Sequence, residues 1–185
     1  GLDSSRETVL LLVHDATRTG APILGWNIAG TLSKRYNVVV VLLGAGPIEH
    51  AFAEVASVVV SVPLLPHAYS PEVGMIARAL IDRYQPLYAV ANSVATRFLA
   101  VGLESANLPV VALVHEFAAD YPQQGTLTPL FAKASKLVFS AETVAAECYS
   151  SDLYLRARNY TILRQGPCAL PAEVASAVAR PPGPA

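Results

Sequence analysis

The sequence has few cysteines and few charged residues, and each shortage excludes a class of protein. Its 185 residues include two cysteines, Cys148 and Cys168, which form no Cys-x-x-Cys pair and are too few for a disulfide framework. We interpret both as small core or surface residues. Charged residues make up 15% of the chain and the formal net charge is −1. No basic surface is therefore available for nucleic acid, and we expect no nucleic-acid partner.

Long hydrophobic runs are also missing, although 53% of the residues are hydrophobic. Glycines and prolines interrupt the apolar segments, among them Gly44, Gly46, Pro47, Pro63 and Pro66, before any segment reaches the roughly 18 residues that a membrane span needs. The N-terminal GLDSSRET lacks the charged-then-apolar order of a signal peptide. We expect no transmembrane helix and a cytoplasmic location, while peripheral membrane contact of a longer protein stays open.

Short apolar runs rich in β-branched residues alternate with helix-like segments along the chain. The runs are apolar at nearly every position, which favours strands buried on both faces of a parallel sheet. The predicted strands are 8–14, 37–44, 57–62, 86–92, 109–115, 136–140 and 160–164, and the predicted helices are 20–36, 70–84, 93–106, 125–134 and 141–150. This alternation predicts a doubly wound α/β fold with a mainly parallel sheet of about seven strands and helices on both faces.

Polar residues follow several predicted strands at the point where each strand ends. They are His14, Asp15, Arg18, Thr19 and Gly20 after the first strand, Asn92 and Ser93 after the fourth, and His115 and Glu116 after the fifth. Ligands of open parallel sheets bind outside the carboxyl ends of the strands. These residues are therefore the candidate site, and we expect Gly20 and His115 to line one crevice at that edge.

The turn between the first strand and the first helix is a candidate anion site. Gly20 stands where the helix begins, and the first N–H groups of a helix have no internal partner and favour an anion. A glycine also lets the backbone approach a phosphate closely. The alternative is an ordinary capped turn with Thr19 as the cap.

Several common motifs are absent. The Walker pattern fails because Trp26 follows Gly25 where a lysine is required, and the dinucleotide fingerprint fails because Glu49 replaces its third glycine. There is no Gly-x-Ser-x-Gly elbow, and HEFAAD has Ala119 where a second zinc histidine would stand. We therefore predict no metal and no other cofactor.

Five segments follow one another in an informative order: VLLLVHDATRTGAPILGWNIAGTLSKRYNVVVVLLG, the Asn92-Ser93 pair, VVALVHEF, KLVFSAETVAAE and YTILRQGPCAL. Together they resemble the N-terminal half of glycosyltransferase family 4 enzymes of the GT-B fold, over about residues 8–170. The resemblance implies a Rossmann-like acceptor-side domain over 8–170, with 171–185 as a tail or the start of an interdomain linker.

The resemblance also implies a reaction. The full-length protein would be a retaining glycosyltransferase of the hexosyltransferase type, using a nucleotide-sugar and an unidentified acceptor (a glycan, a lipid or a small molecule). Most of the nucleotide-sugar would bind a C-terminal Rossmann-like domain that this sequence lacks, so we expect the isolated chain to be inactive. A stand-alone flavodoxin-like or periplasmic-type small-ligand-binding module is the alternative.

The resemblance assigns roles to the residues at the strand ends. Arg18, Thr19 and Gly20 would face the donor phosphates, His115 would lie beside the transferred sugar with Glu116 or Asp15 positioning the acceptor hydroxyl, and Asn92 and Ser93 would bind the acceptor or the sugar. The sequence departs from the family in two turns: Thr19-Gly20 replaces two adjacent glycines, and Arg164-Gln165-Gly166 replaces Pro-Asn-Gly.

Overall fold

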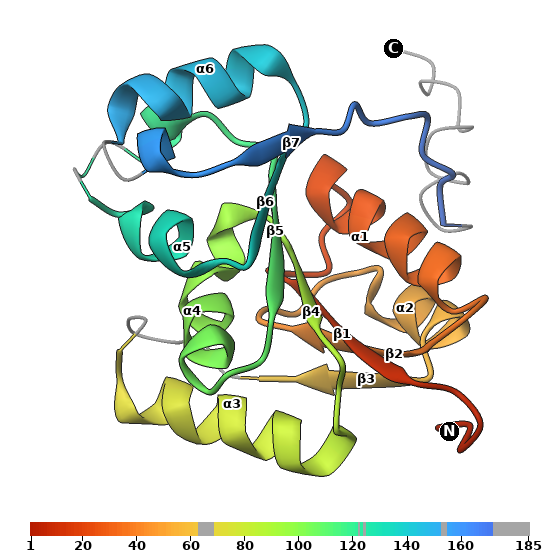
Figure 1. Ribbon diagram of the computed structural model, residues 1–185. Coiled ribbons are helices and arrows are strands. Elements are labelled where there is room, and N and C mark those ends of the chain that lie inside the picture. The colour runs from red at the N-terminus through yellow and green to blue at the C-terminus, as the bar shows by residue number, and fades with distance from the viewer. Residues whose placement is uncertain (63–68, 122, 124, 153–154, 172–185) are drawn as a thin grey trace, which may run out of the picture.

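Seven strands pair in the order β3-β2-β1-β4-β5-β6-β7 in the computed structural model (Figure 1), which describes residues 1–62, 69–121, 123, 125–152 and 155–171. The strands are β1 (Thr8–Val13), β2 (Asn37–Leu42), β3 (Val58–Ser61), β4 (Ala89–Asn92), β5 (Val110–Val114), β6 (Lys136–Phe139) and β7 (Tyr160–Ile162). All six pairings are parallel. The predicted α/β fold and its seven strands are confirmed.

Helices cover both faces of the sheet. They are α1 (Gly20–Leu32), α2 (Glu49–Val55), α3 (Pro71–Tyr84), α4 (Arg97–Ser105), α5 (Thr128–Lys133) and α6 (Glu142–Ser151), with short 3-10 helices η1 (Val94–Thr96), η2 (Ala118–Asp120) and η3 (Leu155–Ala157). α1 and α2 pack on one face, and α3 to α6 pack on the other. The predicted helices are found, and α2 is an addition that the sequence did not predict.

The apolar runs are explained by burial on both faces. Every residue of β1 and β2 is buried. Alternate residues belong to different cores, since Leu10 and Leu12 pack with α3 and α4 whereas Leu11 and Val13 pack with α1 and α2. A run that must be apolar toward two helical layers cannot show the alternation of a half-exposed strand.

One helix boundary agrees with the sequence prediction and another differs from it. α3 begins as expected, with Pro71 in its first turn and the Ser70 hydroxyl accepting a hydrogen bond from the Val73 N–H (3.4 Å). α1 ends at Leu32, so the basic residues Lys34 and Arg35, predicted to lie at the helix end, fall in the turn that follows.

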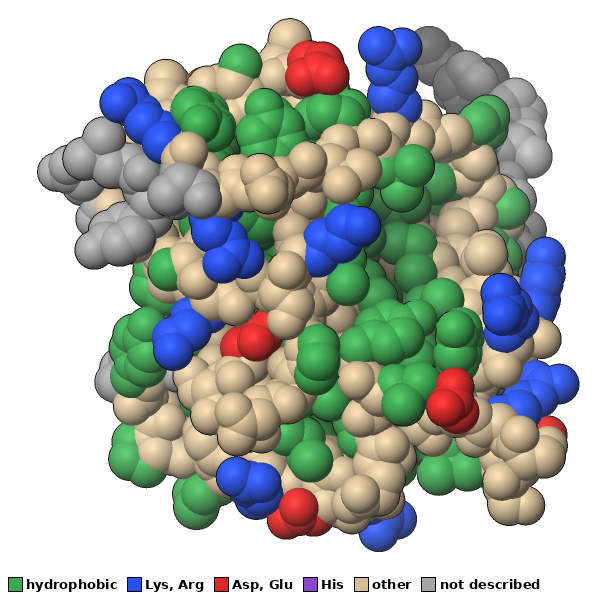
Figure 2. Space-filling model, in the orientation of Figure 1, with side chains coloured by type: hydrophobic (Ala, Val, Ile, Leu, Met, Phe, Trp, Pro, Cys, Tyr) green, Lys and Arg blue, Asp and Glu red, His purple; other side chains and the backbone are tan. Residues whose placement is uncertain are grey.

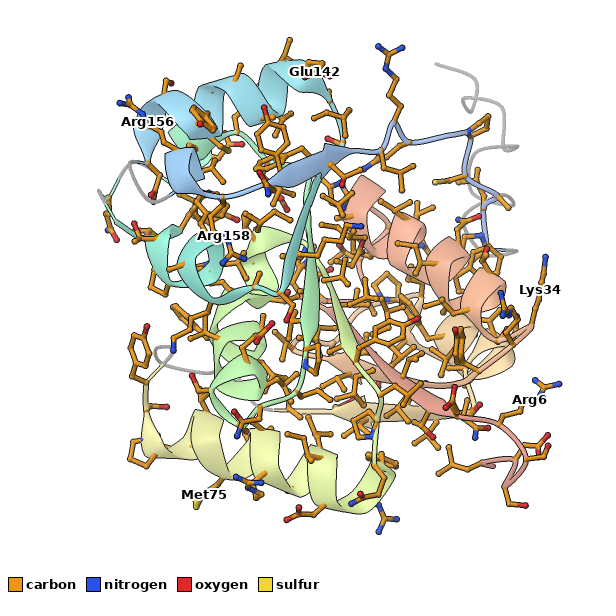
Figure 3. The ribbon with its side chains drawn as sticks, viewed as in Figure 1. Arg6, Lys34, Met75, Glu142, Arg156 and Arg158 are labelled. Atoms are coloured by element: carbon orange, nitrogen blue, oxygen red, sulfur yellow. The ribbon has the colours of Figure 1, made fainter. Side chains whose placement is uncertain are left out.

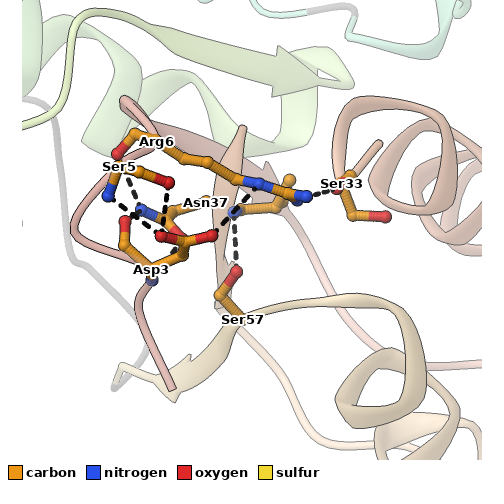
Figure 4. A network of polar contacts seen from close by, with 7 residues as sticks. Asp3, Ser5, Arg6, Ser33, Asn37 and Ser57 are labelled. Carbon is orange, nitrogen blue, oxygen red and sulfur yellow. Dashed lines mark hydrogen bonds and ion pairs between the residues drawn. The ribbon is translucent and has the colours of Figure 1, made fainter. Parts of the chain in front are cut away.

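A polar network ties the N-terminal residues to the amino end of β2 (Figure 4). The Asn37 amide accepts from the Asp3 N–H (2.8 Å) and donates to the carbonyls of Asp3 (2.8 Å) and Arg6 (2.9 Å). Arg6 reaches the Ser33 carbonyl (3.0 Å). This network lies at the amino edge of the parallel sheet, opposite the edge where ligands bind.

The segment after β7 returns across the carboxyl edge of the sheet toward α1 (Figure 1). There the Asn27 side chain donates to the Ala169 carbonyl and accepts from the Ala169 N–H, both at 2.9 Å. Before β7, Arg158 lies over the end of α5 (Figure 3), where it donates to the carbonyls of Ala132 and Ala134. Of the expected tail 171–185, only Pro171 belongs to the described residues.

Within the described ranges, no helix combines the length and the apolar character needed to cross a membrane.

Candidate functional site

The strand order reverses between β1 and β4, because the chain builds outward from β1 to β3 and then from β4 to β7. Such a switch point is where open α/β sheets form a ligand crevice at the carboxyl ends of their strands. The start of α1 follows β1, Asn92 ends β4, and His115 follows β5. The structure therefore brings the predicted residues to one edge, around the switch point.

The loop that leads into α1 is held by a contact with the residues after β2 and by hydrogen bonds within the loop. The Ile48 N–H donates to the Ala16 carbonyl (3.0 Å), and a side chain at Gly46 would overlap that carbonyl. One Asp15 carboxylate oxygen accepts from the N–H (3.0 Å) and hydroxyl (2.8 Å) of Thr17, and the other lies 3.5 Å from His14 Nε2. Asp15, which the resemblance implies could position the acceptor hydroxyl, thus shapes this loop.

The first turn of α1 presents free donors. Thr19 occupies the N-cap position but makes no side-chain capping bond, so the capped-turn alternative lacks its hydrogen bond. The N–H groups of Gly20 and Ala21 have no acceptor among the residues that the structure describes. Arg18 is exposed and forms no ion pair within that same part of the chain. These groups suit an anion.

Gly20 is not required by the packing of the chain. A Cβ at this position would have no heavy atom within 4 Å, and its φ lies outside the region that only glycine adopts readily. A side chain here would extend into open space at the start of α1. Any cost of enlarging Gly20 would therefore come from a ligand or another domain.

Asn92 joins the start of α1 to His115. Its side chain is fully buried, Nδ2 donates to the Ala21 carbonyl (2.7 Å), and Oδ1 lies 3.4 Å from His115 Nε2. Because Nδ2 must face the carbonyl, Oδ1 faces the ring and requires a proton on Nε2. Asn92 was predicted to bind sugar or acceptor, and that role stays a prediction; in the structure its buried amide satisfies these two groups.

The other ring nitrogen of His115 is also engaged. Gln165 Nε2 lies 2.5 Å from His115 Nδ1, and since an amide N–H can only donate, Nδ1 is the acceptor. Burial lowers the pKa of His115, while Glu116 acts in the opposite direction. The ring is thus neutral at neutral pH, with its proton on Nε2. Gln165 belongs to one of the two turns that depart from the family pattern.

The Glu116 carboxylate connects the end of β5 to the start of η1 by hydrogen bonds. Its carboxylate accepts from the Ser93 hydroxyl, the Val94 N–H (3.4 Å) and the His115 N–H (3.1 Å). Ser93 is buried and has a φ of 153°, a region that non-glycine residues occupy only when their surroundings enforce it. Ser93, whose role in binding sugar or acceptor stays a prediction, supports Glu116 from inside the protein.

A cavity of about 230 Å³ opens beside His115. It lies between α1, the ends of β5 and β6, and the segment after β7, and it is lined by Leu24, Ile28, Leu113, His115, Val138, Phe139, Ser140, Leu163, Arg164, Gln165 and Gly166. Figure 2 shows hydrophobic side chains gathered at the surface in the region between α1 and β5. The cavity is mainly apolar, with the His115 ring among its few polar groups.

The described residues include no group of three or more His, Cys, Asp or Glu side chains that could hold a metal ion. Cys148 is buried and Cys168 is exposed, and both are free. Burial raises the pKa of the Cys148 thiol to about 11, so this thiol is protonated at neutral pH and its role is packing.

Gly25 is the residue that lets α1 approach Asn92. A Cβ there would lie 2.9 Å from Asn92 Nδ2 and 3.1 Å from a Val13 methyl group. Gly25→Ala should lower the free energy of unfolding by about 1–2 kcal/mol, because overpacking outweighs the gain in helix propensity. Gly30→Ala on the same helix meets only Val55 at 3.7 Å and should raise it by up to ~1 kcal/mol. Equal effects in urea denaturation would contradict this close approach.

His115 should titrate below the ordinary histidine pKa of 6.5, as measured by NMR. The unfolded chain then binds more protons as the pH falls below that value, so the contribution of His115 to stability is present above it and is lost as the pH falls through the folded pKa. Gln165→Ala removes a donor to the neutral ring and should raise the pKa. A wild-type pKa at or above the ordinary value would refute the neutral ring.

No family model and no curated protein matches the sequence. Solved structures match the fold. A structure of HepE from Anabaena in complex with UDP and glucose superposes with a TM-score of 0.67 and 16% identity, covering 85% of this chain and 44% of that chain. The HepE complex with UDP gives a TM-score of 0.68 at 15% identity.

UGT2 of Phytolacca americana, complexed with UDP-2fluoro-glucose and pterostilbene, matches with a TM-score of 0.51 and 10% identity over 96% of this chain and 57% of that chain. At such identities the likeness is one of fold. The chain spans less than half the length of HepE. Its seven-stranded parallel sheet with helices on both faces is thus a Rossmann-like fold that matches domains of GT-B glycosyltransferases.

Proposed function

We propose that this chain is the N-terminal, acceptor-side domain of a retaining glycosyltransferase of family 4, which transfers a sugar from a nucleotide-sugar to an acceptor without a metal. The observation that carries the proposal is the link through Asn92, which holds the free N–H groups of α1 and the neutral His115 at one switch-point edge. The HepE complex with UDP and glucose, whose fold matches, supports the same chemistry.

The start of α1 would stabilise the departing nucleoside diphosphate. The N–H groups of Gly20 and Ala21 and the exposed Arg18 would face the diphosphate, on which negative charge builds up as its bond to the sugar breaks. Donors that are already in place need no reorganisation during the reaction. A C-terminal Rossmann-like domain would hold the rest of the nucleotide against this face.

His115 would orient the transferred sugar. Its Nδ1 is an acceptor occupied by Gln165, and a sugar hydroxyl that donates to Nδ1 would replace that amide. The lowered pKa keeps the ring neutral and able to accept. Glu116 or Asp15, at the same edge, would position the acceptor hydroxyl, with Ser93 holding Glu116 in place.

Transfer by the two-domain protein tests the proposal. Gly20→Val should reduce the turnover of a UDP-sugar by roughly 10²-fold, the effect of losing one preorganised charge-stabilising contact. The fold should be unaffected, because a Cβ at Gly20 meets no atom within 4 Å. His115→Ala should also slow transfer.

Gly74→Val is the matched control, since Gly74 lies on α3 and its Cβ also has no neighbour within 4 Å. Equal activity of the Gly20 and Gly74 variants would contradict the phosphate-facing role. Turnover of a UDP-sugar by the 185-residue chain alone would refute the need for a second domain.

A further inference from the structure

A second cavity, with a polar lining, adjoins the site on the α4 side of the sheet. Its volume is about 220 Å³, and it is lined by Arg97, Asp120, Tyr121, Gln123 and Thr126. A neighbouring cavity of about 350 Å³ shares three of these residues, Tyr121, Gln123 and Thr126. The two cavities together can hold more than a single ion.

The Arg97 guanidinium is fixed in place but not satisfied. Its central carbon lies 4.4 Å from the centre of the Phe98 ring and 5.3 Å from that of Tyr121, and Nη1 donates to the Val94 carbonyl at 3.4 Å. Nε is buried and has no hydrogen-bond partner among the residues that the structure describes. A buried donor without an acceptor is costly. Nε itself has almost no accessible surface, so a ligand would meet Arg97 through the outer nitrogens of the guanidinium, which lines the cavity.

The charge of Arg97 is also uncompensated. Arg97 forms no ion pair with any residue in the described ranges, although the exposed Asp120 lines the same cavity. Guanidinium groups remain protonated in proteins even where burial disfavours the charge. The cavity therefore presents a permanent cation whose planar fork matches the oxygens of a phosphate or a carboxylate.

Arg97 directly follows the short helix η1, which is bonded to Glu116 at the carboxyl edge of the sheet. The Val94 carbonyl accepts from Arg97, and the Val94 N–H donates to Glu116. The Glu116 charge is close enough to Tyr121 to raise the pKa of that phenol, to which burial contributes most. A ligand held by Arg97 would thus lie on the same side as Glu116, away from α1.

We propose that this cavity binds an anionic group, a phosphate or a carboxylate, carried by the acceptor, with Arg97 as its main ligand. This inference rests on the proposed transferase function and adds the substrate class. Gln123, Thr126 and the Tyr121 hydroxyl would contact the polar remainder of the acceptor. A negatively charged acceptor is then selected over a neutral one of the same shape.

NMR titration of the 185-residue chain with glucose 6-phosphate, glucuronate and glucose tests the site directly. We expect a charged probe to bind, with shifts at Tyr121 and Thr126, and the comparison of the two charged probes to separate phosphate from carboxylate. Arg97→Gln should raise the dissociation constant roughly thirtyfold or more, as expected for truncating one partner of a desolvated charge pair. Arg78→Gln, at an exposed arginine of α3, should leave it unchanged.

If Arg97→Gln fails to fold, the positions of the shifted signals in the wild-type chain and the effect of Thr126→Val decide the matter. Equal binding of glucose and the charged probes, or shifts confined to α1, would overturn the proposal. Binding of a charged probe through Arg97 in a two-domain protein that turns over no UDP-sugar would refute the transferase function and leave the anion site standing. Transfer to a charged acceptor that Arg97→Gln does not alter would refute the anion site alone.

Discussion

The buried amide of Asn92 is the constraint on which the carboxyl edge of the sheet depends. It lies at the switch point between the neighbouring strands β1 and β4. From β1 the chain adds strands toward one edge of the sheet, and from β4 it adds them toward the other edge. The two ends of the amide satisfy the Ala21 carbonyl and the His115 ring. Leaving a buried polar group of this kind unpaired costs about 1–3 kcal/mol. The approach of α1 to Asn92 in turn requires Gly25, which leaves room for the amide.

The proposed function uses the donors that this network leaves without an acceptor. Glu116 and Ser93 satisfy one another and the local backbone, and Asn92 satisfies the Ala21 carbonyl and the His115 ring. The donors that remain without an acceptor in the described part of the chain include those at the start of α1 and the Nε group of Arg97. In the function that we propose, the first set would bind the donor diphosphate and the Arg97 guanidinium would bind an anionic acceptor.

The sequence predicted the sheet because each strand is apolar toward two helical layers, as the complete burial of β1 and β2 shows. It predicted the edge because parallel strands end together. It missed α2, a helix that follows Gly46 and Pro47. With seven residues, this helix is too short to show a clear helical periodicity of apolar residues. It did not predict that Asn92 and Ser93 are buried, because a polar residue after a strand can face water or a neighbouring backbone, and only the packing of α1 and β5 decides which. The contact between Gln165 and His115 was not predicted either, since the two residues lie 50 positions apart in the sequence.

The protonation of the His115 ring tests this account most directly. A long-range ¹H–¹⁵N correlation spectrum of the ¹⁵N-histidine-labelled chain at neutral pH reports which ring nitrogen carries the proton. The account predicts the neutral form with the proton on Nε2, because Asn92 Oδ1 faces Nε2 and Gln165 donates to Nδ1. A proton on Nδ1, or a charged ring at neutral pH, would contradict it and would break the link between α1 and His115.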